Sequence, residues 1–160
     1  MKKEKIILVL NGSLPKKNNL FIFLKKYNKV FCADGAANKV IESDIKPNLI
    51  LGDLDSLSEK YSKKYSKQLV KLPDQNFNDF QKILVWLKKN NYQTMDIIGL
   101  DGNRLDHMIG NFHIAIQQLK KFNFTIFTST GILYTIEKNR MFENCINIRM
   151  CWVYIPPSYI

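Results

Sequence analysis

Cysteine is sparse in this chain of 160 residues. Its three cysteines, Cys32, Cys145 and Cys151, form no Cys-x-x-Cys pair, and one thiol would be left over if two were bridged. These counts exclude a disulfide framework and a zinc site of the usual cysteine spacing. Cysteine usage of this kind is typical of a reducing compartment, so we expect a cytoplasmic protein.

Long hydrophobic runs are also missing. The apolar run near the N-terminus, residues 6–10, ends at Asn11-Gly12. It is shorter than the roughly 7–15 apolar residues of an export signal. No run approaches the roughly 18 apolar residues that a membrane span needs. We therefore expect no membrane partner.

Acidic residues are few, since 14 Asp and Glu stand against 24 Lys and Arg, for a net charge of +10. Only three of the basic residues are Arg, although the guanidinium fork is the group that best matches phosphate oxygens. We interpret most of the positive charge as a solvated lysine surface and expect no nucleic-acid partner. Apolar residues make up 46% of the chain, which excludes wholesale disorder.

Short apolar runs alternate with stretches of helical period along most of the chain. Continuous apolarity is typical of strands that are covered on both faces. The alternation predicts an α/β fold with a mainly parallel sheet and helices on both of its faces. Apolar spacing predicts helices over residues 80–87 and 109–119. The predicted strands are residues 6–10, 30–33, 49–51, 69–72, 97–100 and 124–127.

The sequence also contains helix-capping signals and, after residue 130, a change from alternating strands and helices to strand patterns alone. The pairs Ser56/Glu59 and Asn78/Gln81 have the spacing of capping boxes and predict two helix starts. Residues 131–137 and 145–155 resemble β-strands. We therefore divide the chain into an α/β domain, residues 1–130, and a short β-rich C-terminal segment, residues 131–160. That segment is either a hairpin on the edge of the sheet or the remnant of a second β-rich module.

The nine aspartates all lie between residues 34 and 106, and four of them directly follow predicted strands or lie one residue beyond them. Ligands of open α/β sheets bind outside the carboxyl ends of the strands. Carboxylates from separate strands that meet at this edge would suit a divalent cation and phosphate groups. The alternative is that each aspartate caps a loop. The four are Asp34, Asp53, Asp74 and Asp101.

Three local segments sharpen this prediction. In Gly52-Asp53-Leu54-Asp55-Ser56, two carboxylates at i and i+2 of an extended segment would face one cation, unless they are solvated in a Ser-capped turn. In the second segment, residues 73–82, Asp79 is expected in the first turn of a helix. It would be either a further metal ligand, beside N–H groups that receive phosphate oxygens, or a residue whose negative charge the helix dipole favours.

The third segment, Gly99 to His107, runs from a strand through a glycine-bearing loop into a helix. This geometry can cradle an anion, and Arg104 is the only arginine in the first 139 residues. The alternative is that Arg104 forms an ion pair with Asp101 or Asp106.

With these segments in order, the chain resembles the thiamine pyrophosphokinase family. The matching pieces are residues 32–38, 52–56, 74–80 and 99–107, and the resemblance extends over about residues 6–130. It implies transfer of a pyrophosphoryl group from ATP to thiamine, with release of AMP. It also implies a homodimer, in which a C-terminal β domain helps to form the thiamine pocket. Residues 131–160 would then be a reduced or truncated form of that thiamine-binding domain.

The resemblance also implies roles for individual residues. Mg²⁺ would be coordinated by Asp53, Asp55 and Asp79, with Asp74 as a ligand or close by. The catalytic set would be these first three aspartates and Arg104. The nucleotide site would be lined or supported by Asp34, Asn38, Asp74, Gln75, Asn76, Arg104 and Asp106.

Two other functions fit the same residues. One is a pyrophosphokinase that acts on another alcohol, such as a hydroxymethyl pterin. The other is a nucleotide-binding module without catalysis. Phosphoryl-type transfer needs mainly positioning and charge neutralisation, which carboxylate-held Mg²⁺, an Arg and helix N-termini can supply.

Overall fold

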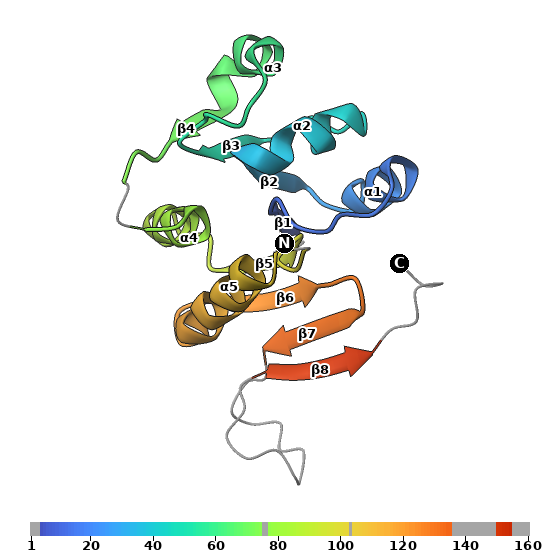
Figure 1. Cartoon of the computed structure of the whole chain (residues 1–160), viewed down its shortest axis with the longest axis vertical. Helices are drawn as coiled ribbons and strands as arrows, with labels where there is room; N and C mark the ends of the chain where they lie inside the picture. The colour runs from blue at the N-terminus through green and yellow to red at the C-terminus, as the bar shows by residue number, and fades with distance from the viewer. Residues whose placement is uncertain (1–3, 75–76, 103, 136–149, 155–160) are drawn as a thin grey trace, which may run out of the picture.

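The computed structural model describes residues 4–74, 77–102, 104–135 and 150–154. The described strands form one eight-stranded sheet in the order β4-β3-β2-β1-β5-β6-β7-β8 (Figure 1). The strands are β1 (Ile6–Val9), β2 (Lys29–Ala33), β3 (Leu49–Gly52), β4 (Leu69–Lys71), β5 (Thr94–Ile98), β6 (Asn123–Phe127), β7 (Gly131–Thr135) and β8 (Met150–Tyr154). The helices are α1 (Lys17–Leu24), α2 (Asp34–Glu42), α3 (Glu59–Lys64), α4 (Asp79–Lys89) and α5 (Leu105–Gln118), with a 3-10 turn at Ser66–Gln68.

The expected α/β class is confirmed. Strands β1 to β6 pair in parallel, and β7 and β8 continue the sheet as antiparallel strands beyond β6. The first of the two alternatives for the C-terminal segment therefore fits its described residues, which lie at the edge of the sheet. The interpretation of residues 131–160 as a reduced thiamine-binding domain stays a prediction.

Two apolar clusters, one on each face of the sheet, explain the continuous apolar runs. In β1, Ile6 and Leu8 pack into the cluster beneath α4 and α5, whereas Ile7 and Val9 pack into the cluster beneath α1, α2 and α3. Successive side chains of a strand point to opposite faces, so a strand covered on both faces must be apolar at every position. Figure 1 shows the helices on both sides of the sheet.

Three of the sequence-based predictions about individual strands and helices need correction. Strand β5 begins at Thr94 and ends at Ile98, not at residue 100, because Gly99 adopts a φ of +76° and turns the chain out of the sheet. Helix α3 starts after Ser58, so the predicted Ser56/Glu59 capping box is wrong. In contrast, Asn78 and Gln81 form the predicted capping box of α4.

The third correction concerns α5. The helix is present, but two apolar residues that predicted it are exposed, Ile109 by 59% and Ile116 by 56%. Its buried residues are Ile114 and Ala115. None of the described helices has the length and apolarity to cross a membrane.

Candidate active site

A cleft of about 820 Å³ opens at the carboxyl ends of the parallel strands. The chain runs from β1 outward to β4 and then returns to the other side of β1 as β5, so the sheet reverses its strand order between β1 and β5. Such a switch point is where open α/β sheets bind ligands. The cleft is lined there by the loop after β1, the start of α2, the loop after β5 and the N-terminal turns of α4 and α5.

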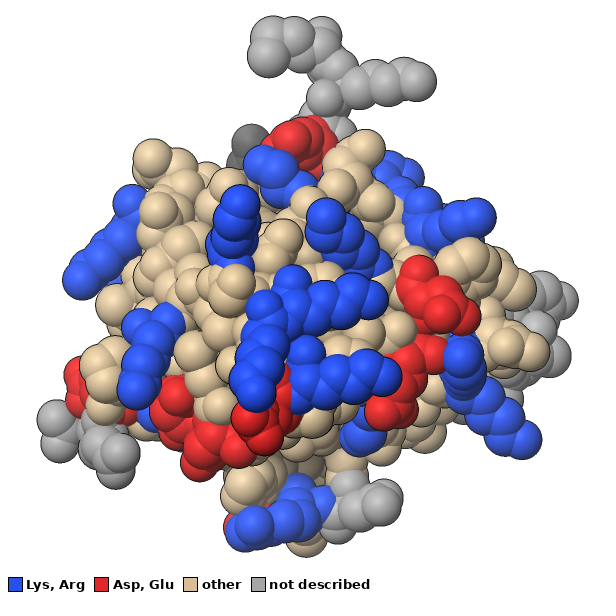
Figure 2. Space-filling view, turned by 90° about the horizontal axis from the view of Figure 1, so that it is seen from above, with Lys and Arg blue, Asp and Glu red and all other residues tan. Residues whose placement is uncertain are grey.

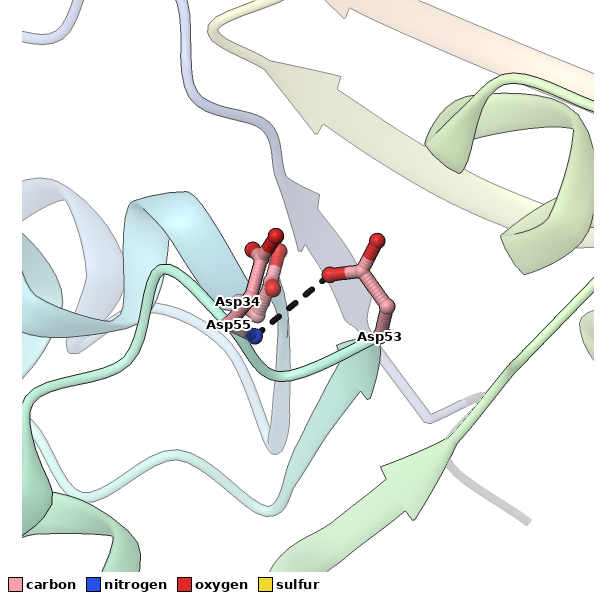
Figure 3. A group of neighbouring side chains, drawn as sticks. All are labelled: Asp34, Asp53 and Asp55. Atoms are coloured by element: carbon pink, nitrogen blue, oxygen red, sulfur yellow. Dashed lines mark hydrogen bonds between the residues drawn. The ribbon is translucent and has the colours of Figure 1, made fainter. Parts of the chain in front are cut away.

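Three of the expected aspartates meet beside this cleft. Asp34, Asp53 and Asp55 each offer a carboxylate oxygen, and these oxygens lie within 4.8 Å of one another. Figure 3 shows the Asp53 carboxylate turned toward Asp34 and Asp55, with its Oδ1 accepting a hydrogen bond of 3.4 Å from the backbone N–H of Asp55. Clustered carboxylate oxygens are the donor set that Mg²⁺ prefers, so these residues fit a divalent cation.

The local backbone brings the Asp53 and Asp55 carboxylates together by a route that differs from the predicted one. The segment after β3 is a bend instead of an extended strand, and Leu54 adopts a left-handed conformation with a φ of +74°. The i, i+2 alternation of an extended strand is therefore the wrong explanation for the proximity of the two carboxylates. A non-glycine residue in this region is uncommon and marks a conformation that surrounding contacts enforce.

Asp34 supplies those contacts from the start of α2. Its Oδ2 accepts a hydrogen bond of 3.0 Å from the backbone N–H of Leu54, and its Oδ1 accepts one of 2.7 Å from the N–H of Gly35. Asp34 is buried at 4% exposure. Burial raises the pKa of this carboxyl, and the nearby negative charges of Asp53 and Asp79 raise it further. Asp34 thus both joins the carboxylate cluster and fixes the loop that carries it.

Gly52 makes this arrangement possible. A Cβ atom at this position would lie 2.7 Å from Cγ of Asp34. The absence of a side chain lets the end of β3 lie against the Asp34 carboxyl. Any larger residue would displace the carboxyl from the cluster.

Asp53 has the opposite electrostatic environment. Its partial burial works to raise its pKa, but hydrogen bonding from Asp55 and Asp34 and the nearby Lys82 ammonium outweigh this and leave the pKa below its usual value. Lys82 Nζ lies 3.9 Å from Oδ2 of Asp53 and 3.1 Å from Oδ1 of Asp79. Asp53 is therefore held in its ionised form, which is the form that binds a cation.

The remaining expected metal ligands lie outside the cluster of three carboxylates. Asp79 is the first residue of α4 and lines the cleft, but it is not one of the three clustered carboxylates. Asp74 is exposed on the segment between β4 and α4 and is not among the residues that line the cleft. Gln75 and Asn76, expected in the nucleotide site, lie outside the described residues.

Arg104 and Asp106 lie together at the cleft and at the start of α5. Two hydrogen bonds join them, 3.2 Å from Nε to Oδ1 and 2.6 Å from Nη2 to Oδ2. The Arg104 guanidinium lowers the pKa of Asp106 to about 2, and the pKa of Arg104 is raised in turn. His107, also at the cleft, places Nε2 3.9 Å from Oδ2 of Asp106. The predicted ion pair is therefore present, and both partners are exposed to an incoming ligand.

Two further polar residues hold loops beside the cleft in place. Asn38 donates to the backbone carbonyl of Ser56 and accepts from the N–H of Ser58, so it ties α2 to the loop after β3. Asp101 is buried, and its Oδ2 accepts from both the backbone N–H and the hydroxyl of Ser129. Asn38 thus acts through the loop, and Asp101 ties the loop after β5 to the turn after β6.

Charges of both signs lie on the face of the molecule that Figure 2 shows. Figure 2 shows Lys and Arg side chains scattered over the visible face, with Asp and Glu in smaller groups among them. A hollow between α4 and α5, lined by Phe77, Leu84, Val85 and Ile114 with lysines around them, contains no acidic residue. This hollow therefore lacks the carboxylates that meet beside the switch-point cleft.

Sequence reasoning missed two features of this site. The resemblance implies a nucleotide-site role for Asp34 and does not name it as a metal ligand, whereas its carboxylate also belongs to the cluster with Asp53 and Asp55. Sequence reasoning also passed over Lys82, which is only 9% exposed. The sequence could have indicated that Lys82 is buried, because helical spacing puts it on the apolar side of α4, next to Ile83 and four residues from Trp86.

The fold and the cleft together define a class: an α/β protein with a carboxylate cluster at the switch point of a parallel sheet, suited to a divalent cation and phosphate groups. The model of the family described as thiamin pyrophosphokinase, catalytic domain, matches residues 22–128. The chain belongs to this family.

Named relatives agree with that assignment. Thiamine pyrophosphokinase of Saccharomyces cerevisiae is 34% identical over 125 residues, covering 70% of this chain and 39% of that protein. Thiamin pyrophosphokinase 1 of Caenorhabditis elegans is 29% identical over 93 residues, covering 52% of this chain and 38% of that protein. The chain therefore spans about two-fifths of the length of the curated relatives it matches.

Solved structures support the fold. The thiamin pyrophosphokinase from Candida albicans superposes with a TM-score of 0.66 at 20% identity, covering 82% of this chain and 60% of that one. At this identity the likeness concerns the fold alone.

Proposed function

We propose that the chain catalyses the Mg²⁺-dependent transfer of a pyrophosphoryl group from ATP to thiamine. The observation that carries the proposal is the meeting of Asp53 and Asp55 with Asp34, which lines the switch-point cleft, in a chain that belongs to this family. The family model and both curated relatives are named for thiamine. This favours thiamine over a pterin alcohol and a catalytic role over simple nucleotide binding.

In this proposal Asp34, Asp53 and Asp55 hold Mg²⁺, and Asp79 faces the same cleft from α4. Mg²⁺ bound there neutralises charge on the phosphate chain of ATP. The bend at Leu54 keeps Asp53 and Asp55 aimed at one point before any ligand arrives. Such preorganisation matters because the carboxylates then need no rearrangement during the reaction.

Arg104 and Asp106 form the nucleotide side of the proposed site. The Arg104 guanidinium is exposed at the cleft and is held by Asp106, so it can present its remaining N–H donors to phosphate oxygens. The N-termini of α4 and α5 also reach the cleft, and their backbone N–H groups favour anions. Positive groups and carboxylates thus share the lining of one cleft.

The bond changes are those of an alcohol attacking the β-phosphorus of ATP. The hydroxyethyl oxygen of thiamine forms a bond to this phosphorus, the bond to the oxygen bridging to the α-phosphorus breaks, and AMP leaves. The hydroxyl proton passes to a carboxylate or to water. The residues here contribute orientation and charge neutralisation, which is what this reaction type requires.

A homodimer and a cytoplasmic setting belong to the same proposal. The dimer is supported by the resemblance on which the sequence prediction rests. The cytoplasmic location is supported by the small number of cysteines. We also propose that acceptor recognition involves the β-rich segment after residue 130.

The test is a turnover assay with ATP, Mg²⁺ and thiamine that follows AMP. We expect AMP formation to require all three reactants and to fall by at least about a hundredfold in Asp53→Asn, a loss typical of removing a key electrostatic group. Glu59→Gln is the matched control, because Glu59 is an exposed carboxylate on α3 that pairs only with Lys63 among the ion pairs of the described residues. Equal turnover in Asp53→Asn and Glu59→Gln would overturn the proposed function.

A further inference from the structure

Lys82 is a buried cation in a place where helix stability disfavours one. Its side chain is 7% exposed, and it is the fourth residue of α4. Lysine is almost never buried unless it is paired. A positive charge near a helix N-terminus also opposes the helix dipole. The exposed cations Lys88 and Lys89 lie at the C-terminal end, where the dipole favours them.

The partners of Lys82 come from two different elements of the site. Its Nζ donates a hydrogen bond of 3.1 Å to Oδ1 of Asp79, at the start of α4. The same atom lies 3.9 Å from Oδ2 of Asp53, which follows β3. One ammonium group therefore joins the helix side of the cleft to the strand side that carries the carboxylate cluster.

This placement balances a concentration of negative charge. Asp34, Asp53 and Asp55 bring carboxylate oxygens within 4.8 Å of one another, and the negative charge of Asp79 also reaches Asp34. Like charges at such distances repel, most strongly where solvent is partly excluded. A buried cation among them lowers that repulsion while no metal ion is bound.

We propose that Lys82 is a positioning residue that serves as the resident counter-charge of the carboxylate cluster. Its ammonium draws Asp53 and Asp79 together and keeps the cluster assembled in the absence of a metal ion. An arriving divalent cation must then share the Asp53 carboxylate with Lys82, so Lys82 also limits cation affinity. The inference rests on the proposed function only in taking the cluster as a divalent-cation site.

A Lys82 variant should become less stable and yet bind a cation more tightly, a combination that loss of structure alone would not produce. Lys82→Met removes the charge and keeps an unbranched side chain. Without cation, the variant should unfold about 5 °C or more below the wild type, because the carboxylates repel one another. Mn²⁺ should nevertheless bind about tenfold more tightly, because the competing charge is gone. Saturating Mn²⁺ should then restore most of the lost thermal stability.

The experiment measures Mn²⁺ binding by electron paramagnetic resonance and thermal unfolding with and without Mn²⁺, in the absence of nucleotide. Lys82→Arg should keep the wild-type Mn²⁺ affinity, because it keeps the charge. Lys82→Gln is the second neutral variant, should Lys82→Met not fold. Lys63→Met is the matched control, because Lys63 forms an exposed helical ion pair with Glu59 and should change neither measurement.

Weaker or unchanged Mn²⁺ binding in the neutral variants would overturn the proposal, as would equal affinities in Lys82→Arg and Lys82→Met. Absence of Mn²⁺ binding in the wild type would also overturn it. None of these measurements needs turnover. If Mn²⁺ behaves as expected but no AMP forms from ATP and thiamine, the proposed function fails while the role of Lys82 stands.

Discussion

Replacing Asp34 by Asn tests how the loop that carries the cluster is held. The change keeps the shape of the side chain but removes one of its two acceptor oxygens. In the wild type, both oxygens accept backbone N–H groups, from Gly35 at 2.7 Å and from Leu54 at 3.0 Å. In Asp34→Asn, the amide NH₂ must face one of those donors, which leaves a buried N–H without its acceptor.

The expected cost follows from these two bonds. A hydrogen bond to a charged group contributes about 1.5–3 kcal/mol, and a buried donor left unpaired costs about 1–3 kcal/mol. Relief of repulsion between Asp34 and Asp53 offsets part of this, so we expect a net loss of about 2 kcal/mol. For a chain of this size, that corresponds to a fall in Tm of about 4–8 °C.

The pH dependence of the same variant has a defined sign. The pKa of Asp34 is raised in the folded protein, so the native state binds this proton more tightly than the unfolded chain does. Wild-type stability should therefore decline as pH rises from the ordinary Asp pKa through the raised folded pKa. Asp34→Asn lacks this decline, so the Tm difference between the two proteins should narrow over that range.

The assay is thermal unfolding followed by circular dichroism at several pH values, with no divalent cation present. Asp44→Asn is the matched control, because Asp44 follows the same helix at its other end, is 81% exposed in its side chain and has a positive φ that Asn tolerates. A Tm for Asp34→Asn equal to that of Asp44→Asn would refute the role given to Asp34. A difference that widens with pH would refute the pKa argument.

Three further predictions concern single contacts. In Arg104→Gln, the carboxyl of Asp106 should titrate well above its wild-type pKa of about 2, as followed by NMR, and the KM for ATP should rise while the fold persists. In Gly52→Ala, the added methyl should displace Asp34 and lower both the Tm and Mn²⁺ affinity, measured by unfolding and by titration. In Asn78→Ala, loss of the α4 cap should lower the free energy of unfolding by about 1 kcal/mol in urea, with Mn²⁺ affinity retained.

The sheet and most of its strands were predictable because burial on both faces leaves a direct trace in the sequence. Every residue of β1 is buried, so its apolar run is continuous. Helix α1 is harder to predict from the sequence, because only Leu20 and Leu24 among its residues are buried. The boundary of β5 depends on the left-handed turn at Gly99, which a reading of apolar runs does not register.

Much of the candidate site was predictable for a different reason. Parallel strands bring their carboxyl ends to one edge, so Asp34 and Asp53 could be expected at the same edge because each follows a predicted strand. Which carboxylates meet depends on the bend at Leu54 and the close approach at Gly52, and these arise from contacts between residues distant in the chain. Lys82 was overlooked because it is one lysine among many, and only packing distinguishes it.

Product analysis shows which group the chain transfers from ATP and to which acceptor. The protein is incubated with ATP, Mg²⁺ and thiamine, and all nucleotide and thiamine species are separated and quantified. We expect one AMP for each thiamine diphosphate, with neither product above background in Asp53→Asn. Formation of ADP with thiamine monophosphate, or an unchanged yield in Asp53→Asn, would contradict pyrophosphoryl transfer at this carboxylate cluster.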